Sequence, residues 1–315
     1  VLGPLAGLLV LAYFVAQRPP CRLLAWLVPY AALAILVTAA TWPYLWEGPT
    51  RFLDAFRFMS DNPTVLPVLF GGEVYRAYDL PRRYLPFFLL TTLTEFVWPA
   101  SVVGTVTVLH NSRSEPRRLL QALLLLAWFA IPALYVVLRR PPMYDGMRHF
   151  LFILPPLFIL AAGAFDLLLR RLARPLVGAL AVVVVLLPGL VGIVRLHPYE
   201  YTYYNSFVGG TSAVFRKYET DYWLTCYREA VETFNRMETR PVNLYVHREA
   251  EVARPFAGPN VSVPDERGAR SRIAPGDFVL VNTRTNEDRQ VFHDAPELLQ
   301  VGRAGAAFCI IKSIQ

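Results

Sequence analysis

The sequence has few charged residues and very few cysteines. Charged residues make up 17% of its 315 positions, and cysteine occurs only three times. Soluble domains carry about 25% charged residues, so a purely soluble protein is not expected. Three cysteines are too few for a disulfide-rich scaffold, and a hydrophobic share of 55% excludes a disordered chain.

Positive charge is concentrated in the apolar part of the chain. In residues 1–195 arginine greatly outnumbers aspartate and glutamate, whereas in residues 196–315 the basic and acidic residues nearly cancel. A basic, apolar segment indicates membrane topology and contact with the lipid bilayer rather than binding to nucleic acid. Because the chain begins at Val1 within an apolar run, we expect further segments before it.

Long apolar segments predict an α-helical polytopic membrane protein with about six spans. A span needs about 20 mostly apolar residues. The expected spans are Val1–Ala16, Leu23–Ala40, Leu85–Leu109, Leu119–Leu138, Phe150–Leu169 and Leu176–Val194. The short basic connections near Arg18, Arg113 and Arg170 are expected in the cytoplasm. The transmembrane domain 1–195 then has an outer loop at residues 47–84, and the tail from residue 196 also lies outside the cytoplasm.

Residues 196–315 are expected to form a small extracytoplasmic α/β domain. Tyr222–Met237 has helical spacing of apolar residues, and Arg248–Arg272 is expected to be a loop. Three short segments bounded by Pro, Gly or Asn predict strands: Val242–His247, Asp277–Asn282 and Ala306–Ile311.

Two of the cysteines would share the outer compartment. Cys226 and Cys309 could form a disulfide there or stay as two buried thiols, whereas Cys21 lies at the cytoplasmic boundary. No spacing of cysteine and histidine indicates a structural zinc site.

The first polar segment of interest ends the outer loop. Tyr75, Arg82, Arg83 and Tyr84 gather where this loop meets a membrane helix. Guanidinium groups there could hold a phosphate through paired N–H donors, and the tyrosines could line a sugar or isoprenoid pocket. The alternative is a set of snorkelling arginines within an interfacial aromatic belt.

The second polar segment lies at the outer end of the helix that begins near residue 150. Tyr144, Asp145, Arg148 and His149 occur within six residues, with Gly146 permitting a tight turn. They could form a phosphate site or a proton-transfer pair. The alternative is a hydrated helix start in which Asp145 forms a salt bridge with Arg148.

Aromatic and acidic residues alternate after the last span, in residues 197–205 and 218–223. Carbohydrate sites use this mixture, because rings pack on sugar faces while carboxylates and amides bond hydroxyl groups; an interfacial aromatic collar is the alternative.

Glu95 is a carboxylate within an expected span, where it is either functional or part of a polar seam between helices.

Seven motifs, ordered along residues 41–235, carry a resemblance to a known family: Trp42-Pro-Tyr-Leu-Trp46, Phe56-Arg-Phe-Met-Ser60, Val68-Leu-Phe-Gly-Gly-Glu-Val-Tyr75, Leu80-Pro-Arg-Arg-Tyr-Leu-Pro86, Tyr144-Asp-Gly-Met-Arg-His-Phe150, His197-Pro-Tyr-Glu-Tyr201 and Glu219-Thr-Asp-Tyr-Trp223. The chain resembles the GT-C superfamily of polytopic membrane glycosyltransferases, in particular the bacterial relatives of protein O-mannosyltransferases and aminoarabinose transferases. It departs from them at Arg82-Arg83, where relatives often have an aromatic pair.

The resemblance implies transfer of a sugar from a polyprenyl-phosphate carrier to an acceptor at the outer face of the bacterial inner (plasma) membrane. The family's catalytic base is an acidic residue in its first outer loop; no residue here matches it, so we expect it upstream. For the donor phosphate we expect Arg82, Arg83, Arg148 and His149, and for the sugar or lipid pocket Tyr75, Tyr84, Tyr144 and Asp145. A divalent metal could assist, although no ligand cluster indicates one. The alternatives are a transporter or flippase for a lipid-linked glycan, and a non-catalytic membrane scaffold with a sugar-binding tail.

Overall fold

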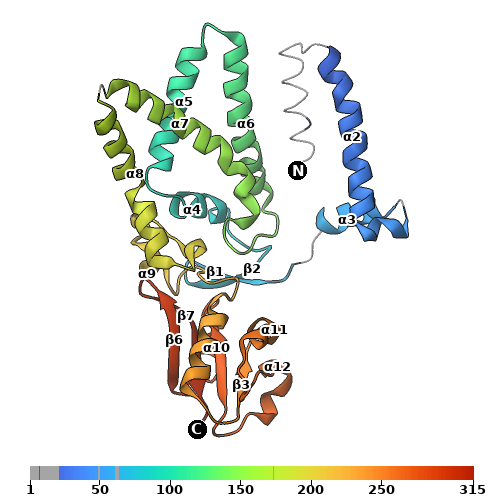
Figure 1. The fold of residues 1–315 in the computed structure, drawn as a ribbon, viewed down its shortest axis with the longest axis vertical. Helices are drawn as coiled ribbons and strands as arrows, with labels where there is room; N and C mark the ends of the chain where they lie inside the picture. Colours follow the sequence, from blue (N-terminus) through green and yellow to red (C-terminus); the bar gives the residue numbers. More distant parts are fainter. Residues whose placement is uncertain (1–6, 8–20, 49, 61–63, 173) are drawn as a thin grey trace.

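The computed structural model describes residues 7, 21–48, 50–60, 64–172 and 174–315. A helical part is followed by a tail that contains a β-sheet (Figure 1). The expected span Leu23–Ala40 lies within helix α2 (Cys21–Thr41). The expected span Val1–Ala16 falls, apart from Gly7, outside the described residues.

Three helices of the described part are long and apolar enough to cross a membrane. They are α6 (Pro116–Arg139), the continuous segment Arg148–Arg171 formed by η2 (Arg148–Ile153) and α7 (Leu154–Arg171), and α8 (Pro175–Leu196). Each matches an expected span. Proline stands in the first turn of α6, α7 and α8, where its missing N–H costs no helical hydrogen bond.

The expected span Leu85–Leu109 is not one helix, which corrects the prediction. Residues 84–91 form α4 (Tyr84–Thr91), and after a break at residues 92–96 the chain continues as α5 (Val97–Ser112). In Figure 1, α4 lies across the tail-side ends of the longer helices, while α5 runs beside α7. Ser101 fixes this pairing, because its hydroxyl donates to the carbonyl oxygen of Leu157 at 2.8 Å.

The segment that follows α8 satisfies the polar groups of this break. The amide nitrogen of Asn205 donates to the carbonyl oxygens of Leu90 and Leu93 at 2.7 and 2.9 Å. Oε1 of Glu95 accepts from the backbone N–H of Ser206 at 2.7 Å. Buried backbone outside a helix needs such internal partners, and the contacts of Glu95 are those of a polar seam between segments.

The loop 47–84, which the sequence predicts to lie outside the cytoplasm, has its own secondary structure. Beyond η1 (Pro43–Glu47) it contains α3 (Arg51–Ser60) and an antiparallel hairpin of β1 (Pro67–Phe70) and β2 (Glu73–Arg76). Gly71 and Gly72 form its turn with φ of +67° and +87°, values that glycine adopts without steric cost.

The tail contains a five-stranded sheet in the order β4-β3-β5-β7-β6. The three expected strands are confirmed as β3 (Val242–Val246), β5 (Phe278–Asn282) and β7 (Ala306–Ser313). Strands β4 (Val261–Ser262) and β6 (Glu297–Arg303) were not predicted. Strand β3 is parallel to β4 and β5, whereas β7 is antiparallel to β5 and β6.

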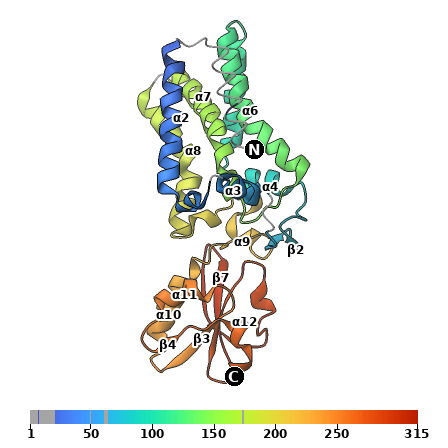
Figure 2. The ribbon, with the colours of Figure 1, turned by 90° about the vertical axis from the view of Figure 1, so that its right-hand side faces the viewer.

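Helices cover both faces of this sheet (Figure 2). The expected helix is α10 (Cys226–Met237), and its buried face of Tyr227, Ala230, Val231 and Phe234 packs on alternate strand residues such as Leu244 and Phe308. The other alternating set, including Tyr245 and Val279, packs near α12.

Short elements complete the structure of the tail. The expected loop Arg248–Arg272 is wrong in part, because it holds α11 (Ala250–Ala253), η5 (Arg254–Phe256), β4, α12 (Glu266–Ala269) and η6 (Arg270–Arg272). The connection from α8 contains η3 (Glu200–Thr202), η4 (Ser206–Val208) and α9 (Gly210–Val214), and η7 (Glu287–Arg289) follows β5.

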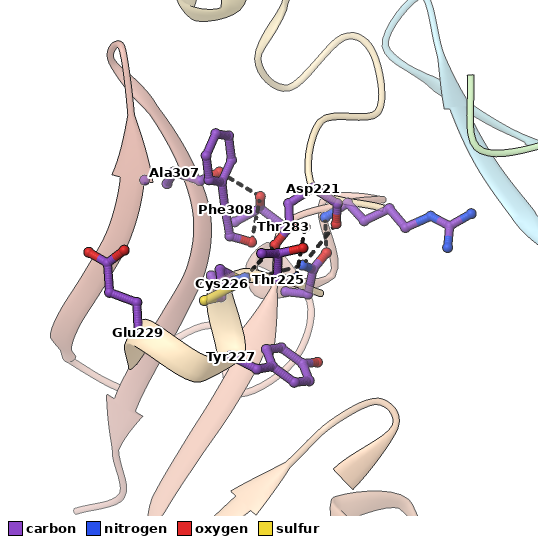
Figure 3. The surroundings of a disulfide bond; sticks show 12 residues. Asp221, Thr225, Cys226, Tyr227, Glu229, Thr283, Ala307 and Phe308 are labelled. Carbon is purple, nitrogen blue, oxygen red and sulfur yellow. Dashed lines mark hydrogen bonds between the residues drawn. A yellow bond between two sulfur atoms is a disulfide. The ribbon is translucent and has the colours of Figure 1, made fainter. Parts of the chain in front are cut away.

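Cys226 and Cys309 form a disulfide, which resolves the alternative left open by the sequence. The bond joins the first residue of α10 to β7 (Figure 3). Beside it, the carboxylate of Asp221 accepts from the backbone N–H groups of Thr225 and Cys226 at 3.0 and 2.9 Å, so it satisfies amide groups at the start of α10.

Candidate functional site

A cavity of about 230 Å³ lies where the helical part meets the tail. This volume is close to the lower end of the range of about 300–1,000 Å³ that is typical of ligand pockets. Its lining comes from α4 and the break after it, from the connection between α6 and α7, and from the segment after α8. The polar and aromatic lining residues are Phe88, Thr92, Arg148, Glu200, Tyr201, Tyr203, Tyr204, Glu219, Tyr222 and Trp223.

A buried arginine from the tail, Arg284, does not line the cavity itself but pairs with the lining residue Glu219. The side chain of Arg284 is only 8% exposed, and it bonds Asp145 at 2.5 Å and Glu219 at 2.8 Å. Arg284 follows the carboxyl end of β5 within the run Asn282–Thr285, whose four polar side chains are all buried. A buried guanidinium is tolerable only when its charge is paired, so this contact ties the tail to the helical part.

Asp145 is held in place by a tight turn. Its φ is +56° and that of Gly146 is +61°, and the N–H of Gly146 donates to the hydroxyl of Tyr84 at 3.0 Å. A side chain at position 146 would be strained by this φ and would meet Phe88 and Tyr222. The sequence prediction of a glycine-dependent turn is therefore confirmed in its geometry.

Arg148 lies at the edge of the cavity with its side chain 30% exposed. Its guanidinium bonds Oδ2 of Asp145 at 2.8 Å and lies 5.0 Å from the centre of the Tyr144 ring, while its Nε donates to His149 at 3.1 Å. The salt bridge expected in the alternative interpretation is thus present. Asp145 also pairs with Arg284, which is more buried than Arg148. The negative charge of Asp145 is therefore balanced by two arginines and not by Arg148 alone.

Glu219 is the most buried charged residue of the site. Its side chain is 0% exposed, and Oε1 accepts from Nε of Arg284. Oε2 is shielded from water and has no hydrogen-bond partner among the described residues. Burial raises the pKa of Glu219 to about 7, against the opposing effect of Arg284. The site therefore contains a carboxyl group that exchanges its proton near neutral pH.

Three aromatic rings form one wall of the cavity. Tyr201 packs against Tyr222 and Trp223 with ring centres 5.1 Å apart in each case, and Trp223 is 51% exposed. The hydroxyl of Tyr201 donates to Asp221, the carboxylate that also binds the start of α10. The wall is therefore anchored to the rigid core of the tail.

The structure divides the expected site residues into two groups. Tyr84, Tyr144, Asp145, Arg148 and His149 lie together at or next to the cavity.

The other expected residues, Tyr75, Arg82 and Arg83, do not line this cavity. The hydroxyl of Tyr75 donates to Glu73 at 2.6 Å, the guanidinium of Arg83 lies 5.7 Å from the centre of the Phe70 ring, and Arg82 is exposed. Among the described residues, no group of three His, Cys, Asp or Glu side chains could hold a metal ion.

Sequence reasoning missed Arg284. The available signal was the run Asn282-Thr-Arg-Thr285 directly after the apolar strand β5, because ligand-binding groups often follow the carboxyl ends of parallel strands. The motif that contains Glu219 was noticed, but its partner lies 65 positions away.

Residues from both parts of the chain meet at this cavity. Arg148 and Glu219 line it beside an aromatic wall, and Arg284 joins the two parts that enclose it. No protein-family model, no curated protein and no solved structure matches the chain.

Proposed function

We propose that this chain is part of a membrane glycosyltransferase that takes a sugar from a polyprenyl-phosphate carrier. One observation carries the proposal: the cavity combines a partly exposed guanidinium, a carboxyl group with an unused oxygen and an aromatic wall. These are the groups that a phosphate, a sugar hydroxyl and a sugar face respectively require.

The position of the cavity suits a lipid-linked donor. It lies at the tail-side ends of α7 and α8, because Leu151 and Leu154 line it and the segment after Leu196 encloses it. A lipid whose chains lie between the apolar helices would present its phosphate at this level. Arg148 is the cavity-lining arginine, so its N–H groups would bond the phosphate oxygens and stabilise the charge of the departing lipid phosphate.

Two further features support an extracytoplasmic tail. The opposite ends of the apolar helices, in short connections, carry Arg117, Arg118, Arg170, Arg171 and Arg174, and short basic connections favour the cytoplasmic side. Arg139, Arg140, Arg148 and Arg195 at the tail-side ends are exceptions to this rule. The tail contains a disulfide, and such bonds persist in oxidising compartments. Both favour a sugar acceptor at the outer face of the plasma membrane.

The test of this proposal is the affinity for lipid phosphates in Arg148 variants. Wild-type chain in lipid nanodiscs is titrated with farnesyl phosphate and with farnesyl-phosphate monosaccharides. Arg148→Ala should weaken binding by about 10- to 150-fold, because a charge-assisted contact is worth roughly 1.5–3 kcal/mol. Arg148→Lys should recover only part of the affinity, since an ammonium cannot make the paired contacts of a guanidinium.

Arg170→Ala is the matched control. Arg170 pairs with Asp166 at 2.8 Å on the same helix, but its side chain is 77% exposed and lies at the other end. Its removal should leave affinity unchanged. Equal affinities of Arg148→Ala and the wild-type chain would contradict the proposed role of Arg148 and leave only its salt bridge with Asp145.

A further inference from the structure

Glu219 has an incomplete set of contacts for a buried carboxyl group. Arg284 bonds Oε1, and the hydroxyl of Tyr204 donates to the backbone carbonyl of Glu219 at 2.8 Å. The backbone of Asp145 lies near enough to the carboxyl group to lower the pKa of Glu219, but Oε2 has no hydrogen bond of normal geometry among the described residues. A buried polar atom without a hydrogen bond costs about 1–3 kcal/mol. Since this residue lines a cavity, a ligand that enters the cavity can supply the missing bond.

The titratable groups around Glu219 are either neutral or already paired, so Glu219 is the group that can form a new hydrogen bond with a ligand. From the helical part Tyr84 and Asp145 approach it, and from the tail Arg284 does. Burial raises the pKa values of Tyr204 and Tyr222, so these phenols stay neutral. Asp145 has both oxygens bonded by arginines. The cavity-lining Glu200 is 40% exposed and bonds His197, so Oε2 of Glu219 is the buried carboxylate oxygen without a hydrogen bond among the described lining residues.

We propose that Glu219 recognises the sugar of the lipid-linked donor, with Oε2 accepting a hydrogen bond from a sugar hydroxyl. This inference rests on the proposed function. It adds a residue that contacts the sugar of the donor, whereas Arg148 contacts the phosphate. Tyr222 and Trp223, four positions or fewer from Glu219, supply rings for the sugar face from the same segment. Oε2 is shielded from water in the chain without ligand, so the carboxyl group of Glu219 must turn toward the cavity for a sugar hydroxyl to reach it.

Binding of a sugar hydroxyl to Glu219 should be coupled to the release of a proton from its carboxyl group. Without ligand the carboxyl group is partly protonated near pH 7, because burial raises its pKa to about 7. A donated hydrogen bond stabilises the ionised form, so binding of the sugar should release protons from Glu219 to the buffer near pH 7. Binding of the lipid phosphate without a sugar should release none from this group.

The experiment compares farnesyl phosphate with a panel of farnesyl-phosphate monosaccharides bearing glucose, galactose, mannose or arabinose. For the wild-type chain in nanodiscs, at least one sugar should bind more tightly than farnesyl phosphate alone. Glu219→Gln should reduce this sugar-dependent gain, taken as the ratio of the two affinities measured in the same variant, by about 10-fold or more. Calorimetry in buffers of different ionisation enthalpy measures the proton released by the unaltered chain.

Glu266→Gln is the matched control for removal of a buried carboxylate. Glu266 is also 1% exposed and also has an oxygen without a hydrogen bond, but it bonds His247 within the tail and does not line the cavity. An intact Cys226–Cys309 disulfide in each variant verifies folding. The proton measurement uses the wild-type chain, so it tests the role of Glu219 even if Glu219→Gln fails to fold.

The outcomes separate the two proposals. No gain in affinity from any sugar, an unchanged gain in Glu219→Gln, or no proton release on binding of the preferred sugar would each overturn the role of Glu219 and leave the phosphate site standing. Absence of binding by every lipid phosphate would instead overturn the proposed function together with this inference.

Discussion

At the scale of single residues, Arg284 is the most consequential side chain of the molecule. It supplies the positive charge that allows Asp145 and Glu219 to be buried side by side, and it comes from the other end of the chain. Removing one partner of a buried ion pair costs about 3–5 kcal/mol, because the remaining charge is stranded. Here the loss of a single guanidinium leaves Glu219 without its charge partner and Asp145 with Arg148 alone.

Arg284→Ala is therefore expected to lower the free energy of unfolding by about 3–5 kcal/mol or more. Arg284→Lys should recover little, because one ammonium does not reproduce two N–H contacts in fixed directions. Denaturant unfolding in mild detergent measures both variants. Arg228→Ala removes an exposed arginine that bonds Glu232, and it should cost no more than about 1 kcal/mol. A similar cost for Arg284→Ala would show that the buried pairing is unimportant.

Glu219 also predicts a pH dependence of stability. Folding raises its pKa from 4.5 to about 7, so the folded state binds more protons than the unfolded state between these values. Stability from this group is present below about pH 4.5 and is lost as the pH rises through 7, by on the order of 3 kcal/mol. Glu219→Gln does not titrate. The stability of the wild-type chain minus that of Glu219→Gln should therefore fall between about pH 5 and 8; a constant difference would refute the raised pKa.

At the scale of elements, the break between α4 and α5 depends on a segment from far along the chain. The side-chain amide of Asn205 donates hydrogen bonds to two carbonyl groups at the break, and the backbone N–H of Ser206 donates to Glu95. Without these contacts, a continuous helix would be the simplest way to satisfy the backbone. The break therefore lets α4 run across the helix ends and bring Tyr84 and Phe88 to the cavity region.

Asn205→Ala should destabilise the chain by about 1–3 kcal/mol, because the buried carbonyl group of Leu93 and the partly buried one of Leu90 lose their donor. Thermal unfolding in detergent gives the comparison. Asn260 offers a matched control, since its side-chain amide makes a similar bond to Thr239 at the surface, and Asn260→Ala should change stability by less than about 1 kcal/mol. If the two alanine variants are equally stable, the break does not depend on Asn205.

The sequence allowed local features to be predicted and left distant pairings open. Apolar length predicted α6, α7 and α8, and alternation predicted β3, β5 and β7, because these signals depend on neighbouring residues. Strand β6 was missed because its residues Glu297–Arg303 are mostly polar or exposed at a sheet edge. The break in Leu85–Leu109 and the pairing of Asp145 with Arg284 depend on contacts across more than 100 positions, and no local pattern encodes them.

At the scale of the whole molecule, the orientation in the membrane remains a prediction with a direct test. Asn260→Cys in the tail should react with a membrane-impermeant maleimide in intact cells. Glu115→Cys, before α6, should react only after permeabilisation, because basic connections favour the cytoplasm. The parent for both carries Cys21→Ser, and the Cys226–Cys309 pair does not react while oxidised. Protection of the cysteine at position 260 in intact cells would refute an outer tail.

The contact between Arg284 and Asp145 also limits which tails can be combined with this helical part in a chimera. A chimera that exchanges the tail at residue 196 would move Glu219 and Arg284 together but leave Asp145 behind. An incoming tail without an arginine at this place would leave Asp145 with Arg148 alone, and a tail with an arginine would fail on a helical part without the aspartate. The two parts are thus not interchangeable modules, and the three charged residues must be transplanted as a set.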